Sequence, residues 1–176
     1  LQLRRDSDLS IKFSGLITKK ILSNELIKSF ALPKKIHGTI FSKSTNGMKY
    51  GSHIDNAYMS SGRADLSFTV FLNCKKKYEG GALSIQGLNS EEKFKLDAGE
   101  IIIYPSTYLH SVEKVIDGER LVFIGWIESY VKSIEEREYL FDLDAAARSL
   151  LAKYGRSEEV DLIYKSYSNF LRRLGN

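Results

Sequence analysis

The sequence predicts an α+β fold, mainly β, in which helices flank a sandwich or small barrel of short strands. Its 176 residues suit a single domain that is large enough to bury a core. Its ten Tyr and nine Phe argue for a packed, β-leaning interior. Short strand-like segments separated by turn signals fill the middle of the chain, and helical periodicity occupies both ends. Together these observations give the order helix, barrel, helix.

Residues 1–37 are expected to form a helical support. Apolar residues recur at roughly helical spacing between residues 9 and 30, which indicates one or two amphipathic helices. Pro33 disfavours continuation of a helix past Leu32. The first 50 residues hold ten Lys and Arg but three Asp and Glu. We interpret this excess as a solvated lysine face, with an acidic partner as the alternative. No nucleic-acid-binding motif accompanies it, so no nucleic-acid partner is expected.

Residues 38–128 are expected to form the barrel core. Turn signals bound its strand-like segments at Asn46-Gly47, Gly80-Gly81, Asp97-Ala98-Gly99 and Asp117-Gly118. Strands are predicted in segments rich in β-branched or aromatic residues, namely "GTIFSK", "DLSFTVFLN", "GGALSIQ", "EKFKL", "EIIIYP", "LHSVEKVI" and "RLVFIGWI".

Residues 129–176 are expected to form a C-terminal helical extension that packs on the core as part of one structural unit. Ser133 with Glu136 makes a capping box for a helix that Gly155 ends. Ser157 opens a last helix, whose apolar residues form one stripe. We expect that stripe to pack against the sheet.

The cysteine count and the hydropathy limit the cellular location that the sequence predicts. Cys74 is the single cysteine, so no internal disulfide and no Cys-rich zinc finger can form. A reducing, cytoplasmic location is therefore the expectation. No run of about 18 apolar residues occurs, so neither a transmembrane helix nor a membrane partner is expected. The first residue is Leu, and no signal-like apolar stretch follows it.

The chain has only three histidines, which limits the residues available for a metal or catalytic site. His53 and Asp55 are two residues apart, so in a strand both side chains point to one face. Such a pair is weak evidence alone, but a barrel that brings His110 to it would complete the two-His, one-carboxylate facial triad of non-haem Fe(II) oxygenases. Three protein ligands leave positions open for a bidentate cosubstrate and dioxygen, whereas a structural zinc site closes with four. His37 has no acidic or histidine neighbour at ligand spacing, and we expect it at the surface or in a cap.

Arg120 is the candidate for holding a dicarboxylate cosubstrate, because a guanidinium binds a carboxylate bidentately and stays charged. It begins a strand with apolar alternate residues, so it is expected to face a lined interior. A two-residue hairpin at Asp117-Gly118 would point Arg120 away from the face of His110. Sharing one face requires a bulge or a longer turn, for which Gly118 is suited.

Several segments together resemble one family, the PKHD-type hydroxylases. This bacterial and viral group lies in the prolyl/lysyl hydroxylase class of the Fe(II)- and 2-oxoglutarate-dependent dioxygenases. The resemblance runs from about residue 9 to the end of the chain, including the helical extension. It is carried by "YGSHIDNA", "GRADLSFTVFLN", "YEGGALSI", "GEIIIYPSTYLHSV", "GERLVFIGWIES" and "LFDLD".

The resemblance implies a double-stranded β-helix, which is a jelly-roll or cupin-like barrel. It implies that His53, Asp55 and His110 hold Fe(II), and that Arg120 binds the distal carboxylate of 2-oxoglutarate. Dioxygen is then the second cosubstrate, and ascorbate is the expected reductant.

The resemblance also assigns a substrate pocket and exposes a departure from the family pattern. Asn56, Arg63 and Trp126 match positions that line the site in prolyl-hydroxylase relatives. Family members usually have a tyrosine that can bond the cosubstrate in the strand before the metal motif, where this chain has Ser44. Tyr50 is the candidate to replace it.

The sequence therefore predicts an oxidoreductase, a dioxygenase that hydroxylates an unactivated C–H bond and releases succinate and CO₂. The expected target is a prolyl residue in a peptide or protein. One alternative is hydroxylation of a small molecule, such as an amino acid or a siderophore-related compound. Another is a non-catalytic barrel that senses iron or 2-oxoglutarate. A zinc hydrolase is disfavoured, since no Glu or His is placed to activate water.

Overall fold

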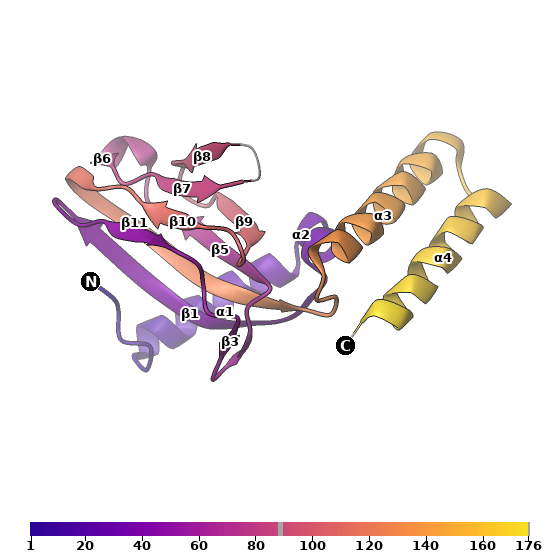
Figure 1. Ribbon diagram of the computed structural model, residues 1–176, viewed down its shortest axis with the longest axis horizontal. Coiled ribbons are helices and arrows are strands. Elements are labelled where there is room, and N and C mark those ends of the chain that lie inside the picture. Colours follow the sequence, from indigo (N-terminus) through magenta and orange to yellow (C-terminus); the bar gives the residue numbers. More distant parts are fainter. Residues whose placement is uncertain (88–89, 176) are drawn as a thin grey trace. The chain divides into compact units, whose positions relative to one another are not determined.

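The computed structural model describes residues 1–87 and 90–175, which form two compact units (Figure 1). The β-unit combines Leu1–Thr18 with Ile36–Glu128, and the helical unit combines Lys19–Lys35 with the chain from Ser129 onward. The mainly β architecture with flanking helices agrees with the predicted fold class. The predicted three-part division after residues 37 and 128, and the packing of the extension on the core, stay predictions.

The larger sheet has the strand order β1-β11-β5-β9, and β6 pairs with β11 beside this path. Its central strand, β5, is antiparallel to both β11 and β9. Every residue of β5 is buried, as its β-branched and aromatic composition predicts. The bounds are β1 (Pro33–Thr45), β5 (Leu66–Phe71), β6 (Tyr78–Gly80), β9 (Ile101–Pro105) and β11 (Val115–Ser129).

The smaller sheet has the order β2-β10-β7-β8, and β3 and β4 form a separate two-stranded hairpin. The pairs β2–β10, β10–β7 and β7–β8 are all antiparallel. One 3₁₀ turn, Lys75–Lys77, precedes β6. The bounds are β2 (Tyr50–His53), β3 (Tyr58–Met59), β4 (Gly62–Arg63), β7 (Leu83–Gln86), β8 (Glu91–Phe94) and β10 (His110–Val112).

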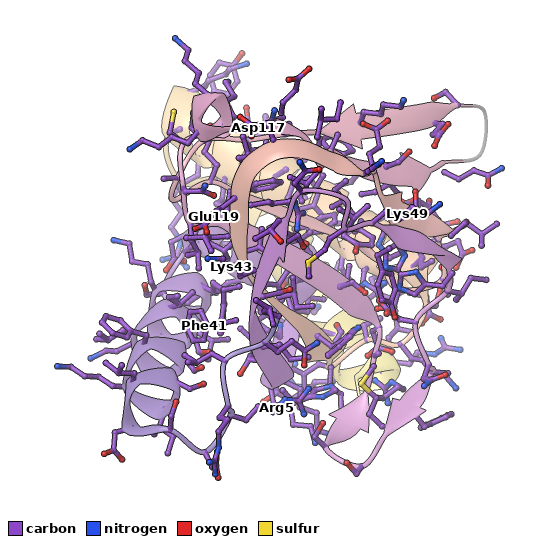
Figure 2. All side chains as sticks on the ribbon, turned by 90° about the vertical axis from the view of Figure 1, so that its left-hand side faces the viewer. Arg5, Phe41, Lys43, Lys49, Asp117 and Glu119 are labelled. Atoms are coloured by element: carbon purple, nitrogen blue, oxygen red, sulfur yellow. The ribbon has the colours of Figure 1, made fainter. Side chains whose placement is uncertain are left out.

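The core of the β-unit lies between the faces of its sheets. Leu83 and Ile85 of the smaller sheet form one buried cluster with Tyr104 of the larger sheet. A second group of rings joins β1 to β11, where Phe41, labelled in Figure 2, lies 4.6 Å from Phe123 between ring centroids. Burial of aromatic side chains from both sheets is the main stabilising contribution expected in such a layered fold.

The chain before Arg120 forms no two-residue hairpin and instead has a bulge, one of the two conditions stated for Arg120 to share a face with His110. The expected strand "LHSVEKVI" is interrupted after Val112, and β11 starts at Val115 and runs through Gly118 without a reversal. β11 pairs there with β6, with a register shift between Val115 and Asp117. Gly118 has a φ of +76°, and a Cβ would lie 2.3 Å from the carbonyl oxygen of Lys77. A bulge in a long strand therefore replaces the two-residue turn.

The N-terminal helical region ends before Pro33, as the sequence predicts. α1 spans Asp8–Leu22 and α2 spans Glu25–Ala31. The Asn24 side chain caps α2 by accepting a hydrogen bond from the Ile27 amide at 3.1 Å. Leu32 takes a left-handed conformation with a φ of 43°, and Pro33 then begins β1. No described helix is both long and apolar enough to cross a bilayer.

The C-terminal helices also follow the predicted boundaries, α3 spanning Ile134–Tyr154 and α4 spanning Glu158–Leu174. Ser133 accepts a hydrogen bond from the Glu136 amide at 3.2 Å, and Gly155 ends α3 with a φ of 78°. The apolar stripe of α4 packs within the helical unit, where Tyr167, Leu171 and Leu174 contact the buried cluster of Leu32, Val131 and Leu140. Whether α4 also packs against the sheet stays a prediction.

Candidate metal centre and its cavity

The two predicted histidine ligands are direct neighbours across the smaller sheet. β2 ends at His53, and the antiparallel pairing of β2 with β10 places His53 opposite His110. Their ring centroids are 4.2 Å apart. Because the sheet register fixes both backbones, the two imidazoles are held side by side before any ligand binds.

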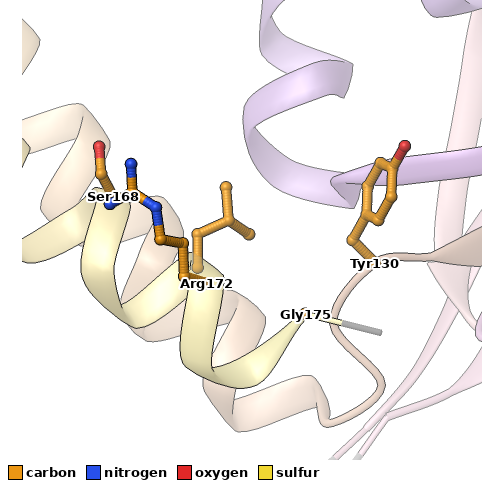
Figure 3. A pocket seen from close by; sticks show the side chains of 5 residues that line it. Tyr130, Ser168, Arg172 and Gly175 are labelled. Carbon is orange, nitrogen blue, oxygen red and sulfur yellow. The ribbon is translucent and has the colours of Figure 1, made fainter.

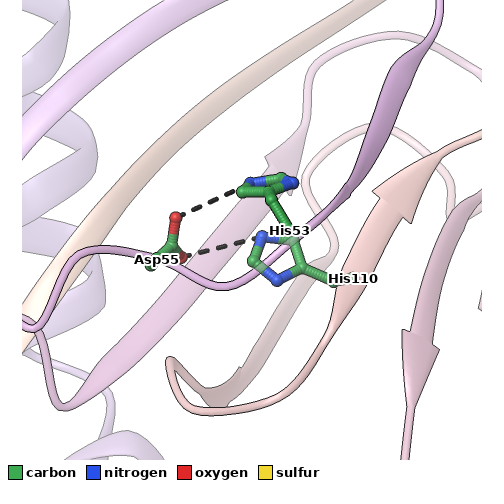
Figure 4. A group of neighbouring side chains, drawn as sticks. All are labelled: His53, Asp55 and His110. Carbon is green, nitrogen blue, oxygen red and sulfur yellow. Dashed lines mark ion pairs between the residues drawn. The ribbon is translucent and has the colours of Figure 1, made fainter.

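Asp55 completes the group from the loop that follows β2, as Figure 4 shows. Its Oδ1 lies 3.8 Å from Nε2 of His53, and its Oδ2 lies 3.7 Å from Nε2 of His110. The potential ligand atoms of the three residues all lie within 4.8 Å of one another. The structure therefore brings the predicted triad together.

Hydrogen bonds to the backbone fix the orientation of both imidazoles. Nδ1 of His53 lies 2.9 Å from the Gly51 carbonyl, and Nδ1 of His110 lies 3.0 Å from the Tyr108 carbonyl. A carbonyl only accepts, so each Nδ1 carries a proton, and in the neutral imidazole Nε2 then has its lone pair free on the side of Asp55. Burial lowers the pKa of His110, which favours this neutral form.

The donor set fits a catalytic divalent metal. It offers two neutral imidazole nitrogens and one carboxylate oxygen, which are the donors of the non-haem Fe(II) triad. A structural zinc site would need a fourth protein ligand. In the part of the chain that the structure describes, the group of potential ligands consists of these three residues.

The triad lies in a cavity of about 570 Å³ inside the β-unit, and Arg120 lines the same cavity. The Arg120 side chain is buried, with its guanidinium 5.6 Å from the centre of the Phe71 ring. Burial lowers its pKa, yet an arginine stays protonated at neutral pH. Its buried Nε has no hydrogen-bond partner among the described residues. A buried cation with an unused donor is suited to an anionic ligand.

The other predicted site residues separate into two groups. Trp126, Ser44 and Tyr50 line the cavity with the triad. The Tyr50 ring lies 4.4 Å from the His53 ring and is largely exposed. Asn56 is exposed and Arg63 pairs with Asp65 at 2.7 Å, and neither belongs to the described cavity lining.

His37 is not at the surface as expected, but buried. Its Nδ1 lies 2.9 Å from the Ser61 hydroxyl, and its Nε2 lies 2.8 Å from the Arg63 carbonyl. It thereby connects β1 to the β3–β4 hairpin. It is not part of the group of potential metal ligands found among the described residues.

Sequence reasoning missed the hydroxyl residues of β5. Ser67 and Thr69 both line the cavity, and the Ser67 hydroxyl lies 2.5 Å from Oδ2 of Asp55. The available signal was their alternation in an otherwise apolar, buried strand, which puts two hydroxyls on one face. Tyr104 of β9 also lines the cavity. Its ring lies 5.1 Å from that of His110, and burial raises its pKa.

A second hollow lies in the helical unit, near the end of α4 (Figure 3). Its volume is about 480 Å³, and its lining consists of Tyr130, Ser168, Leu171, Arg172 and Gly175. These residues include neither a carboxylate nor an imidazole. We therefore assign the candidate chemistry to the cavity of the β-unit.

Family models match both parts of the chain. Residues 39–128 match the 2OG-Fe(II) oxygenase superfamily, and residues 135–175 match the PKHD-type hydroxylase C-terminal domain. The first match contains the triad and Arg120, and the second contains most of α3 and all of α4.

Curated relatives from strains of Prochlorococcus marinus are similar over nearly the whole chain. A PKHD-type hydroxylase of Prochlorococcus marinus strain MIT 9215 is 76% identical over 175 residues, covering 99% of this chain and 79% of the relative. Another, from strain MIT 9515, is 72% identical over 176 residues, covering all of this chain and 80% of the relative.

Solved structures confirm the fold at low sequence identity. A Pseudomonas putida prolyl-4-hydroxylase aligns with a TM-score of 0.56 at 18% identity, covering 73% of this chain and 70% of that one. A Trichoplax adhaerens prolyl hydroxylase, solved with a hypoxia-inducible-factor peptide fragment, aligns with a TM-score of 0.52 at 14% identity, covering 80% and 64%. The predicted double-stranded β-helix is thereby confirmed.

Proposed function

Since the chain belongs to the 2OG-Fe(II) oxygenase superfamily and, within it, to the PKHD-type hydroxylases, we propose that it hydroxylates a prolyl residue in a peptide or protein, with release of succinate and CO₂. It is a 2-oxoglutarate-dependent dioxygenase, and this family implies Fe(II), 2-oxoglutarate and O₂. One observation carries the proposal: an open three-ligand group and a buried arginine share one cavity.

His53, Asp55 and His110 are the proposed ligands of Fe(II). Their support is the mutual proximity of the ligand atoms and the fixed tautomers of both imidazoles. Bound Fe(II) and 2-oxoglutarate supply the oxidising chemistry, in which O₂ gives one oxygen atom to succinate and the other to the substrate C–H bond. The protein positions these groups and requires no side-chain general base for the hydroxylation.

Arg120 is the proposed partner of the distal carboxylate of 2-oxoglutarate. A bidentate guanidinium–carboxylate pair fixes the direction of a dicarboxylate as well as its affinity. Burial among apolar residues strengthens the pair, because it excludes competing water. Tyr50 stays a candidate second contact to the cosubstrate. It lines the cavity, but its exposed position puts it near the solvent side.

A peptide substrate is supported by an unused donor in the cavity lining. The buried Nε1 of Trp126 has no hydrogen-bond partner among the described residues, so it can donate to a substrate carbonyl. The two structural neighbours named above are prolyl hydroxylases, one of them solved with a peptide fragment. Asn56 and Arg63 stay candidates for substrate contact outside the described cavity lining.

The test is a succinate-release assay with Fe(II), ascorbate and 2-oxoglutarate across a panel of proline-containing peptides. Succinate that forms only with particular peptides, together with a gain of 16 Da on a prolyl residue, supports the proposal. Turnover with metabolites but with no peptide would instead establish the small-molecule alternative. Binding of Fe(II) and 2-oxoglutarate with no turnover of any compound would favour a sensing barrel.

Two further parts of the proposal concern the setting of the enzyme. We propose ascorbate as the reductant that keeps the iron in its Fe(II) state, and omission of ascorbate from the assay tests this. We also propose a cytoplasmic location, which is supported by the single cysteine of the chain. Fractionation of cells that express the protein tests the location.

A further inference from the structure

The loop position of Asp55 raises the question of what holds its carboxylate in place. His53 and His110 lie in paired strands, whereas Asp55 follows the end of β2. A carboxylate on a loop is free to rotate unless a partner fixes it, and that freedom weakens metal binding. Such a partner lies on the opposite sheet.

Two buried serines, one in β5 and one directly after β9, form a hydrogen-bonded chain that ends on Asp55. The Ser67 hydroxyl lies 2.5 Å from Oδ2 of Asp55, and it lies 2.7 Å from the Ser106 hydroxyl. Ser67 and Ser106 are 3% and 2% exposed, so water does not compete for these hydrogen bonds.

The direction of the hydrogen bonds follows from the chemistry of the three groups. An ionised carboxylate can only accept, so the single proton of Ser67 goes to Asp55. Oγ of Ser67 must then accept from the hydroxyl of Ser106. The order is Ser106 to Ser67 to Asp55, and each bond polarises the next in the direction that stabilises the negative charge on Asp55.

The backbone holds both serines rigidly. Ser67 lies in the central strand β5, where it is opposite Tyr104 of β9 and Trp126 of β11. Ser106 directly follows β9, and its amide donates to the Asp65 carbonyl at 3.1 Å. The hydroxyl chain therefore attaches the loop after β2, which contains Asp55, to the buried strand β5 of the larger sheet.

We propose that Ser67, supported by Ser106, is a positioning residue for the metal centre, which orients the Asp55 carboxylate and raises the affinity for the divalent metal. The inference rests on the proposed function, because it takes Asp55 to be a metal ligand. Outer partners of metal ligands typically change metal affinity by about 10- to 100-fold when they are removed.

The experiment measures the affinity for Mn²⁺ alone, from the electron paramagnetic resonance signal of the free ion, in wild type and variants. We expect Ser67→Ala to bind Mn²⁺ at least about tenfold more weakly, and Ser106→Ala to show a smaller loss. Because Ser106 acts through Ser67, the double variant should bind as Ser67→Ala does. Ser67→Thr restores a hydroxyl and should recover most of the affinity.

The control is Ser84→Ala, which removes another buried hydroxyl in the β-unit. Ser84 is 4% exposed and hydrogen-bonded to Glu91, and it lies outside the described cavity lining. Its loss should lower the thermal unfolding midpoint without changing the Mn²⁺ affinity. A purely structural role of Ser67 would produce this same pattern in Ser67→Ala, and that result would overturn the inference.

Failure of the inference is distinguishable from failure of the proposed function. If the wild type does not bind Mn²⁺, or if His110→Ala binds it equally well, the proposed metal centre is wrong whatever the serines do. If the wild type binds, His110→Ala does not, and Ser67→Ala keeps full affinity, only the positioning role is wrong. If Ser67→Ala does not fold, the Mn²⁺ affinity of Ser106→Ala tests the inference instead. An unchanged affinity in Ser106→Ala would overturn the proposed role of the hydroxyl chain.

Discussion

Replacement of Arg120 by methionine should separate binding of the cosubstrate from stability of the protein. Methionine keeps much of the length of the side chain but removes the charge and its donors. Arg120 is 4% exposed, and its Nε has no partner among the described residues. Two charge-assisted hydrogen bonds of about 1.5 kcal/mol each would be lost to the distal carboxylate, or about 3 kcal/mol, which is a factor of roughly 150 in affinity.

The same substitution should stabilise the protein in the absence of cosubstrate. A buried donor without a partner costs about 1–3 kcal/mol, and a buried charge adds to that cost. We therefore expect Arg120→Met to raise the free energy of unfolding by about 1 kcal/mol or more, while 2-oxoglutarate affinity falls. Methionine loses the cation–π contact with the Phe71 ring, and its thioether can pack against that ring instead.

The assay for binding is titration of the Mn²⁺-loaded protein with 2-oxoglutarate, followed by fluorescence. Trp126 is the single tryptophan of the chain and lines the cavity, so its emission reports on that site. Urea unfolding measures stability. The control is Arg137→Met, in which a buried arginine that donates to the Val131 and Lys132 carbonyls is lost. It should destabilise the protein and leave 2-oxoglutarate affinity unchanged. Wild-type 2-oxoglutarate affinity in Arg120→Met would refute the assigned role of Arg120.

Two further predictions concern the fold that supports the site. Ser133→Ala removes the hydroxyl that caps α3, and it should lower the free energy of unfolding by about 1 kcal/mol in urea denaturation. An unchanged urea midpoint would refute the capping role. Gly125→Ala should destabilise by about 1–3 kcal/mol, because its Cβ would lie 2.8 Å from the Phe68 ring. Gly15→Ala in α1 is the matched control, because no atom lies within 4 Å of the added Cβ, and it should stabilise the protein by about 0.5–1 kcal/mol. Equal shifts of the thermal unfolding midpoint in the two glycine variants would contradict the packing around Gly125.

Local signals predicted the helices and the three potential metal ligands that the structure brings together. The caps at Ser133 and Gly155 depend on residues within one turn of the helix end, so the sequence alone contains them. The triad was predictable because few residue types bind iron and the chain has only three histidines. Strand alternation correctly placed Arg120 in the lined interior.

Features that depend on distant partners were not predictable from the sequence. The route of β11 through Gly118 is set by its pairing with β6, which no local turn pattern encodes. His37 is buried by contacts to Ser61 and Arg63, which follow it by 24 and 26 residues. The Ser67–Ser106 contact spans 39 residues, and serines are too common in strands to mark it.

The central claim is that the cavity supports O₂-dependent decarboxylation of 2-oxoglutarate at a centre that includes Asp55. The most direct measurement is mass spectrometry of the succinate that the Fe(II)-loaded protein forms from 2-oxoglutarate under ¹⁸O₂, with Asp55→Ala beside it. The ¹⁸O content of succinate does not depend on the identity of the substrate. The account predicts succinate that carries one ¹⁸O atom from the wild type and none from Asp55→Ala. Unlabelled succinate, or labelled succinate at equal yield from both proteins, would contradict it.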